Sequence, residues 1–81
     1  MGQQVTRILE QAFQGIQANL EELPGGRLSG NIVWDGFTGY DQTDRQKLVR
    51  EVLKGALGAQ IQQIGVLLTY TQAELTAMQA A

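Results

Sequence analysis

Apolar residues recur at helical spacing near the amino terminus. They fall at i, i+3, i+4, i+7, i+8 and i+11, which are Val5, Ile8, Leu9, Ala12, Phe13 and Ile16. This spacing places them on one face of an α-helix, and Gly15 is a typical residue at which such a helix ends. The pattern therefore predicts an amphipathic helix over residues 3–15.

The pattern then changes to one that is typical of strands. Apolar and polar residues alternate over residues 16–21 and predict a half-buried strand. The Leu-Pro-Gly-Gly sequence at residues 23–26 has Pro at its second and Gly at its third position, which specifies a type II turn. Residues 28–34 return as a second strand, with Gly30 as a candidate bulge. Residues 16–34 are therefore predicted to form a hairpin.

A corner and a long amphipathic helix follow. Gly36 and Gly39 flank Phe37, so the backbone can turn sharply there. Asp41 is a candidate N-cap for the helix, with Thr43 as a competing candidate. Apolar residues at helical spacing predict one buried face, made of Leu48, Val49, Val52, Leu53, Ala56 and Leu57.

Two further elements complete the predicted fold. Gly58 ends the central helix. Apolar residues then indicate a third strand, led by Ile61, Ile64, Val66, Leu68 and Tyr70. Because its other face is also apolar, we expect this strand to lie inside the sheet. Thr71 followed by Glu74 matches a capping box and predicts a last helix from residue 72 towards residue 81.

The order helix, strand, strand, helix, strand, helix predicts one α+β domain over residues 1–81. Its helices should pack on a three-stranded mixed sheet. The long helix between the second and third strands allows those two strands to run parallel.

Cys and His are both absent from the chain. This removes thiolate nucleophiles, disulfides, imidazole bases and the usual ligands of zinc, haem and iron–sulfur clusters. The acidic pairs Glu21/Glu22 and Asp41/Asp44 lack the convergent geometry of an acid/base dyad. We therefore expect a protein without enzymatic activity, cofactor or bound metal.

Charge and hydropathy limit the location and the partners. The 81 residues carry a net charge of −2 at pH 7, which argues against a surface that is wholly a nucleic-acid footprint. No apolar run reaches the roughly 18 residues that cross a bilayer. The amino terminus lacks a charged-then-apolar signal pattern. We expect a soluble, cytoplasmic protein that does not contact membranes.

Two stretches resemble the BolA-like family. Phe-Thr-Gly at residues 37–39, Asp41 and then Arg-Gln-Lys-Leu-Val at residues 45–49 are similar to its FxG…RH+ signature. Residues 64–71, with Glu74 beyond, lie where the family carries HALS followed by a strand and a TPEE-type helix start. The resemblance implies a fold related to class II KH domains. It also implies partnership with monothiol glutaredoxins, a shared iron–sulfur cluster, and a role in iron sensing or cluster delivery.

This chain departs from the family at the residues that matter for the cluster. Gln46 stands where the family has the His of its RH pair. Gln63, or Gln62 if a one-residue gap is allowed, stands where the family has the His that opens HALS and supplies a cluster ligand. A carboxamide is a poor iron ligand beside imidazole or thiolate. We therefore expect no cluster ligation by the family mode.

The leading hypothesis is a non-enzymatic BolA-like interaction domain that docks a protein partner, for which a monothiol glutaredoxin is one candidate. The resemblance places the contact surface on the first half of the central helix and the start of the third strand. Its predicted residues are Arg45, Gln46, Arg50 and Gln63.

A KH-like nucleic-acid-binding or transcription-regulating module is the alternative hypothesis. Lys47, Arg50 and Lys54 recur at i, i+3 and i+7 and could present a basic stripe to phosphate. In the competing interpretation this is a solvated face on which Glu51 pairs with Lys54 or Lys47. Residues 55–58 match the GxxG of KH domains, yet they follow a helix and precede a predicted strand, as a helix terminator would.

Two interpretations of the aromatic corner also stay open. Trp34 and Phe37 could form an exposed stacking platform for bases or a hot spot for a protein. Alternatively Trp34, the only tryptophan, belongs to the core or half-core beside Ile32 and Val33.

A small subunit of a larger assembly is a third hypothesis for the function of the whole chain.

Overall fold

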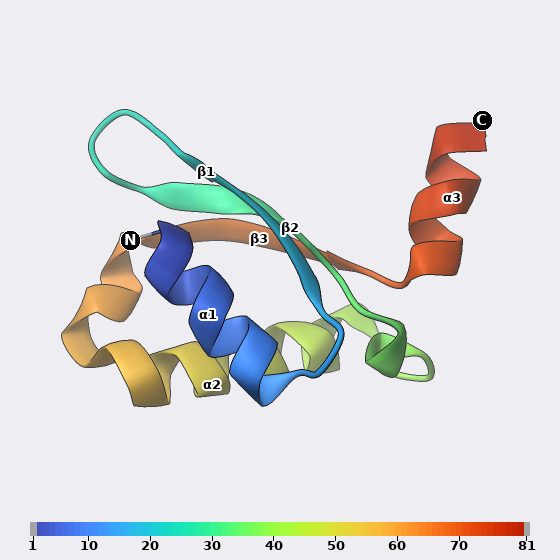
Figure 1. Cartoon of the computed structure of the whole chain (residues 1–81), viewed down its shortest axis with the longest axis horizontal. Coiled ribbons are helices and arrows are strands. Elements are labelled where there is room, and N and C mark those ends of the chain that lie inside the picture. Colours follow the sequence, from blue (N-terminus) through green and yellow to red (C-terminus); the bar gives the residue numbers. More distant parts are fainter. Residues whose placement is uncertain (1, 81) are drawn as a thin grey trace.

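The computed structural model describes residues 2–80, and Figure 1 shows how their elements are arranged. The bounds of these elements are α1 Gly2–Ala12, β1 Gln17–Glu22, β2 Leu28–Val33, η1 Asp35–Phe37, α2 Gln42–Leu57, η2 Gly58–Gln63, β3 Ile64–Tyr70 and α3 Gln72–Ala80. Here η1 and η2 are short 3₁₀ helices. The predicted α+β order of helices and strands is confirmed, and residue 81 of the predicted last helix lies outside the described part of the chain.

The strands form a mixed sheet in the order β1-β2-β3. β1 and β2 are antiparallel, with Ala18 opposite Ile32, whereas β2 and β3 are parallel, with Ile32 opposite Thr69. In Figure 1, α1 and α2 lie together against one side of this sheet, and α3 stands beyond the end of β3, away from them. α2 returns the chain along the sheet, which is why β3 can pair in parallel with β2.

β3 lies at an edge of the sheet, so the prediction that it is an interior strand is wrong. Its inward face carries Leu67 and Thr69, which are both buried. On the opposite face Val66 is 64% exposed and Leu68 is 48% exposed. One face of β3 therefore packs against the core, and its other apolar face is exposed to solvent. Ile61, predicted at the start of this strand, lies in η2 instead.

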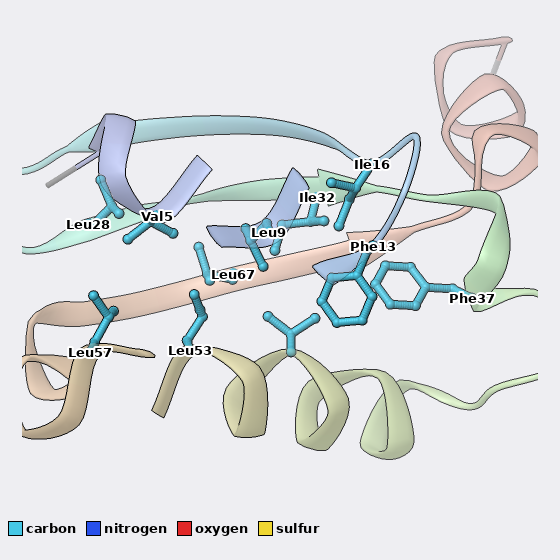
Figure 2. Packing of buried hydrophobic residues seen from close by; sticks show 11 residues of the cluster. Val5, Leu9, Phe13, Ile16, Leu28, Ile32, Phe37, Leu53, Leu57 and Leu67 are labelled. Carbon is cyan, nitrogen blue, oxygen red and sulfur yellow. The ribbon is translucent and has the colours of Figure 1, made fainter. Parts of the chain in front are cut away.

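The core lies between the two helices and the sheet. Figure 2 shows side chains from α1, such as Leu9, and from α2, such as Leu53, directed toward Leu67 of β3. Ile32 of β2 is fully buried among them. Burying such a side chain contributes about 1.5–3 kcal/mol relative to leaving it exposed, so this layer holds α2 against the sheet.

α1 is shorter at its end than predicted. It stops at Ala12, although Phe13 N still donates to Leu9 O at 2.8 Å. Gly15 has a φ of +85° and turns the chain toward β1. Ala12 was predicted on the apolar face but is exposed. Neither α1 nor any other helix within residues 2–80 is long and apolar enough to cross a bilayer.

The predicted hairpin is confirmed. A backbone hydrogen bond closes the turn at residues 23–26, and Gly25 has the positive φ of +88° that a type II turn requires at its third position. Gly30 is needed for close approach, because a Cβ there would lie 2.0 Å from Asn19 O of β1. The register irregularity lies between Leu28 and Gly30 on the side of β3, which holds the additional residue.

α2 begins at the predicted cap. Asp41 accepts a hydrogen bond at its side chain from the N–H of Asp44 at 2.8 Å, so Asp41 rather than Thr43 is the N-cap. The helix ends at Leu57, and Gly58, with a φ of +58°, is its C-cap. Ala56 is exposed, so its predicted place on the buried face is wrong. The buried apolar stripe is narrower than predicted and consists of Val49, Leu53 and Leu57.

Trp34 directly follows β2 and is half-buried. Its indole Nε1 donates to Gln14 O at 2.9 Å. The ring centroid lies 5.0 Å from that of Phe13 and 5.2 Å from that of Phe37, the second pair in edge-to-face contact. Because Phe37 is fully buried, Trp34 and Phe37 form no exposed platform. The half-core interpretation of Trp34 is confirmed.

Candidate functional site: the α2/β3 pocket

A pocket of about 390 Å³ opens between α2, η2 and the first half of β3, and we call it the α2/β3 pocket. Its apolar lining consists of Val49, Leu53, Ile61, Ile64 and Leu67. Its remaining lining consists of Thr43, Gln46, Lys47 and Arg50 from α2, and Gly65 from β3. Among the described residues, no acidic side chain lines it. A pocket that is mainly apolar with a few polar groups is typical of binding sites.

Cations lie on the rim of the pocket. Lys47 and Arg50 are exposed, and neither forms an ion pair or a side-chain hydrogen bond with any part of the chain that the structure describes. The predicted pairing of Glu51 with Lys54 or Lys47 is wrong, because no such ion pair is present within residues 2–80. The rim of the pocket therefore carries two cations that form no ion pair within residues 2–80.

Amide side chains of α2 cover the free edge of β3. Gln46 Nε2 donates to Leu67 O at 2.7 Å, and Gln42 Nε2 donates to Thr69 O at 3.1 Å. Successive carbonyls along a strand point in opposite directions, and Tyr70 O points toward β2, where it accepts from Trp34 N. The carbonyls of Leu67 and Thr69 therefore point away from β2, and side chains of α2 supply their hydrogen-bond donors. Gln46 thus lines the pocket while its amide nitrogen is bound within the fold.

Arg45, which was predicted at the contact surface, is only 4% exposed. Its Nε donates to Tyr40 O at 2.9 Å, and its Nη1 lies 3.4 Å from Thr69 O. Its Cζ lies 5.6 Å from the ring centroid of Phe37, within range of a cation–π contact. Hydrogen bonding to Glu74 raises the pKa of Arg45 above its already high value. Arg45 therefore stabilises the fold and is not available to a partner.

Glu74 completes the arrangement around Arg45. Its two carboxylate oxygens accept from Arg45 Nη1 at 2.6 Å and from Nη2 at 3.1 Å. The predicted capping box is also confirmed: Thr71 N donates to Glu74 Oε1 at 2.9 Å, and Glu74 N donates to Thr71 Oγ1 at 3.2 Å. Hydrogen bonds from Arg45, and then from Thr71, lower the pKa of Glu74 to about 2.

The structure brings together part of the predicted contact surface. Gln46 and Arg50 line the pocket, and Lys47 of the alternative basic stripe lies beside them. Gln63 is exposed at the end of η2, next in sequence to the lining residue Ile64 but not itself part of the lining. Lys54 lies outside the pocket. Sequence reasoning missed the pocket, because Val49 and Leu53 carry the same helical spacing as ordinary core residues.

The residues present do not fit an iron–sulfur cluster. Within residues 2–80, no group of three His, Cys, Asp or Glu side chains could hold a metal ion. The carboxamide of Gln46 donates to Leu67 O, and Gln62 and Gln63 are exposed on η2. A carboxamide offers iron a weak neutral oxygen in place of imidazole or thiolate. No chemistry of this site is therefore assigned to a cluster.

The GxxG match at residues 55–58 forms no loop. Its first three residues belong to α2, and Gly58 begins η2. The predicted strand does come after this segment, but η2 separates α2 from β3. The helix-terminator interpretation is confirmed at Gly58, the C-cap of α2.

Comparisons with known proteins identify the fold. No family model and no curated protein matches the sequence. Among solved structures, BolA1 from Arabidopsis thaliana matches with a TM-score of 0.75 and 18% identity, covering 90% of this chain and 93% of that one. The fold is BolA-like. The BolA domain of SufE1 from Arabidopsis thaliana matches with a TM-score of 0.73 and 22% identity, covering 90% of this chain and 93% of that one.

A Bol-like protein from Babesia bovis also has this fold. It matches with a TM-score of 0.65 and 23% identity, covering 98% of this chain and 93% of that one. The resemblance to BolA-like proteins found in the sequence is therefore confirmed at the level of the fold. In this BolA-like fold, the α2/β3 pocket lies where α2 meets η2 and the first residues of β3.

Proposed function

We propose that this chain is a non-enzymatic BolA-like interaction domain that docks a protein partner at the α2/β3 pocket. The observation that carries the proposal is an open, largely apolar pocket whose rim carries two cations that form no ion pair within residues 2–80. Gln46 and Arg50 contribute to the contact surface from α2, and Gln63 extends it from η2. Arg45 is left out, because its guanidinium is bound inside the fold.

A monothiol glutaredoxin, or another protein of an iron–sulfur pathway, is the partner class that the BolA-like resemblance suggests. The contact would involve no ligation of a cluster by this chain, since the carboxamides at the relevant positions are poor ligands. One of the matched structures is a BolA domain of SufE1. This match supports the view that a BolA-like fold can serve as a domain within a larger protein.

The proposal is tested by differential affinity isolation. The wild-type chain and the double variant Arg50→Glu, Gln63→Ala are used as bait in extracts of the source cells, with Lys54→Gln as a control on the same helix. We expect one partner to bind the wild type and the control but not the double variant. Purified partner should then shift amide resonances around residues 46, 50 and 63. A partner that binds all three baits equally would overturn the proposed surface.

Adding cluster-loaded monothiol glutaredoxin to the wild-type chain tests the narrower assignment. We expect amide shifts at the α2/β3 pocket without a change in the visible absorbance of the cluster. Absence of both changes would exclude this partner while leaving the docking proposal intact.

Nucleic-acid binding is a second candidate function, and a specific observation favours it. Lys47, Arg50 and Lys54 are exposed along α2, and none forms an ion pair with another described residue. Such cations could contact successive phosphates of a single strand. The pocket beside them contains no aromatic side chain from the described residues on which a base could stack, so we rank this function second.

A further inference from the structure

We infer that the α2/β3 pocket recognises a short acidic–apolar segment of its partner, in which one apolar side chain fills the pocket and neighbouring carboxylates pair with Lys47 and Arg50. This inference rests on the proposed docking function and names the chemistry of the partner. It is carried by the shape of the pocket, by its lining and by the charge of its rim.

The apolar part of the pocket fits an anchoring side chain. Val49, Leu53 and Leu67 are buried at its base, and Ile61 and Ile64 are half-buried around them. Its volume of about 390 Å³ lies near the lower end of the roughly 300–1,000 Å³ typical of ligand pockets. A pocket of this size accepts a side chain such as Leu, Met or Phe but not a whole helix. Apolar anchors seated in such pockets commonly dominate the energy of an interface.

The charge of the rim selects the residues next to that anchor. Lys47 and Arg50 border the pocket without partners among residues 2–80, and no acidic side chain of that range lines it. This local positive charge contrasts with the net charge of −2 of the whole chain. Complementary charges across an interface speed association and exclude wrong partners. A partner with Asp or Glu beside its apolar anchor meets both conditions, whereas a basic segment would be repelled.

Two polar side chains of α2 determine how a partner segment can bind beside β3. The amide nitrogen of Gln46 is held by Leu67 O at 2.7 Å, so this side chain is fixed at one side of the pocket. The same bond occupies the edge carbonyl of Leu67, and Gln42 occupies that of Thr69. The edge of β3 is therefore closed to strand addition there, and recognition has to proceed through side chains.

The experiment is selection of heptapeptides from a random library displayed on phage, with the wild-type chain as target. We expect enriched sequences that place one Leu, Ile, Met or Phe within three positions of one or two Asp or Glu. A fluorescein-labelled consensus peptide is then titrated by anisotropy. The variant Lys47→Gln, Arg50→Gln should weaken its binding about tenfold, and Lys54→Gln, the matched control outside the pocket, by less than about twofold.

Two further measurements separate the anchor from the charges. Replacing the apolar residue of the peptide by Ser should weaken binding about tenfold, because the pocket is then left unfilled. Reversing the rim with Lys47→Glu and Arg50→Glu should abolish binding of the acidic peptide and create binding of a peptide with Lys in place of its Asp or Glu. Circular dichroism of each variant verifies that the helix content of the chain is unchanged.

Several outcomes would overturn the inference. They are no enrichment, a consensus that is basic or lacks an apolar residue, and equal weakening by Lys54→Gln. Residues 21–23 of this chain, Glu-Glu-Leu, are themselves an acidic–apolar segment, and Leu23 is 39% exposed. Enrichment of sequences like this one, together with concentration-dependent sedimentation of the chain, would assign the pocket to a second copy instead. If the isolated partner still requires Arg50 and Gln63 while no acidic–apolar consensus emerges, the docking function stands and only the inference fails.

Discussion

Glu74 at the first turn of α3 holds both terminal guanidinium nitrogens of Arg45 at the first turn of α2. The two bonds measure 2.6 Å and 3.1 Å, and they join residues that lie 29 positions apart. The same carboxylate caps α3 through Thr71. One side chain therefore both starts the last helix and attaches it to the rest of the domain. Asp35 adds a second link, since its Oδ1 accepts from Gln72 N at 3.0 Å.

This pair predicts a loss of stability in acid. The pKa of Glu74 is lowered to about 2 in the folded chain, below the roughly 4.3 of an unfolded chain. Its contribution to stability is therefore fully present above the unfolded pKa and is lost as the pH falls through the folded value. We expect urea midpoints, followed by Trp34 fluorescence, to decline between about pH 5 and pH 2.

The variant Glu74→Gln isolates this effect. It should be less stable than the wild type at pH 7, because buried Arg45 loses its charged partner, and its stability should change less between about pH 5 and pH 2. Glu10→Gln, at an exposed site of α1, serves as the control and should follow the wild-type curve. A Glu74→Gln variant as pH-sensitive as the wild type would contradict the prediction.

Two glycines should respond oppositely to alanine. At Gly30 the new Cβ would lie 2.0 Å from Asn19 O and φ is +156°, so Gly30→Ala should cost about 3 kcal/mol. At Gly55, inside α2, the space around a Cβ is open, so Gly55→Ala should raise stability by about 1 kcal/mol. Urea unfolding of both variants measures the difference. Similar effects at the two sites would mean that β1 and β2 do not approach each other so closely.

Gln46 should contribute to stability as well as to the pocket. Gln46→Leu removes the donor to Leu67 O and should cost about 1 kcal/mol. An uncovered strand edge also favours self-association, so the variant should sediment as larger species at high concentration. Gln60→Leu, on the exposed surface of η2, is the matched control. Equal behaviour of both variants would remove the role assigned to Gln46 at the edge of β3.

The second candidate function makes a prediction about salt. If Lys47, Arg50 and Lys54 each neutralise one phosphate, the plot of log Kobs for single-stranded DNA against log salt should have a slope of roughly −2. Replacing all three by Gln should remove this dependence. Binding that the triple variant retains would reject this candidate, and absence of any binding by the wild type would do the same.

Local features of the sequence predicted most of the elements. These features depend on residues that lie close together in the sequence. They are the spacing of apolar residues in α1 and α2, the turn at residues 23–26 and the Thr71/Glu74 capping box. The roles of Asp41 and Gly58 at the ends of α2 were predictable for the same reason. The lack of Cys and His argued against cluster ligation from residue chemistry alone.

The arrangement in space depended on contacts between distant residues. The residues of β3 are apolar on both faces, but only the strand order places this strand at an edge with Val66 exposed. Arg45 has the sequence pattern of a surface cation, and it is buried because Tyr40, Thr69 and Glu74 converge on its guanidinium.

The amino-acid sequence by itself determined the helices, the hairpin and the lack of imidazole and thiolate ligands, since these follow from short-range spacing and from residue chemistry. Tertiary structure alone decided which cations are free of ion pairs within residues 2–80, where the pocket opens and how α3 is held. Burial and ion pairing depend on which side chains come into contact in the folded chain. Short-range patterns in the sequence do not specify those contacts.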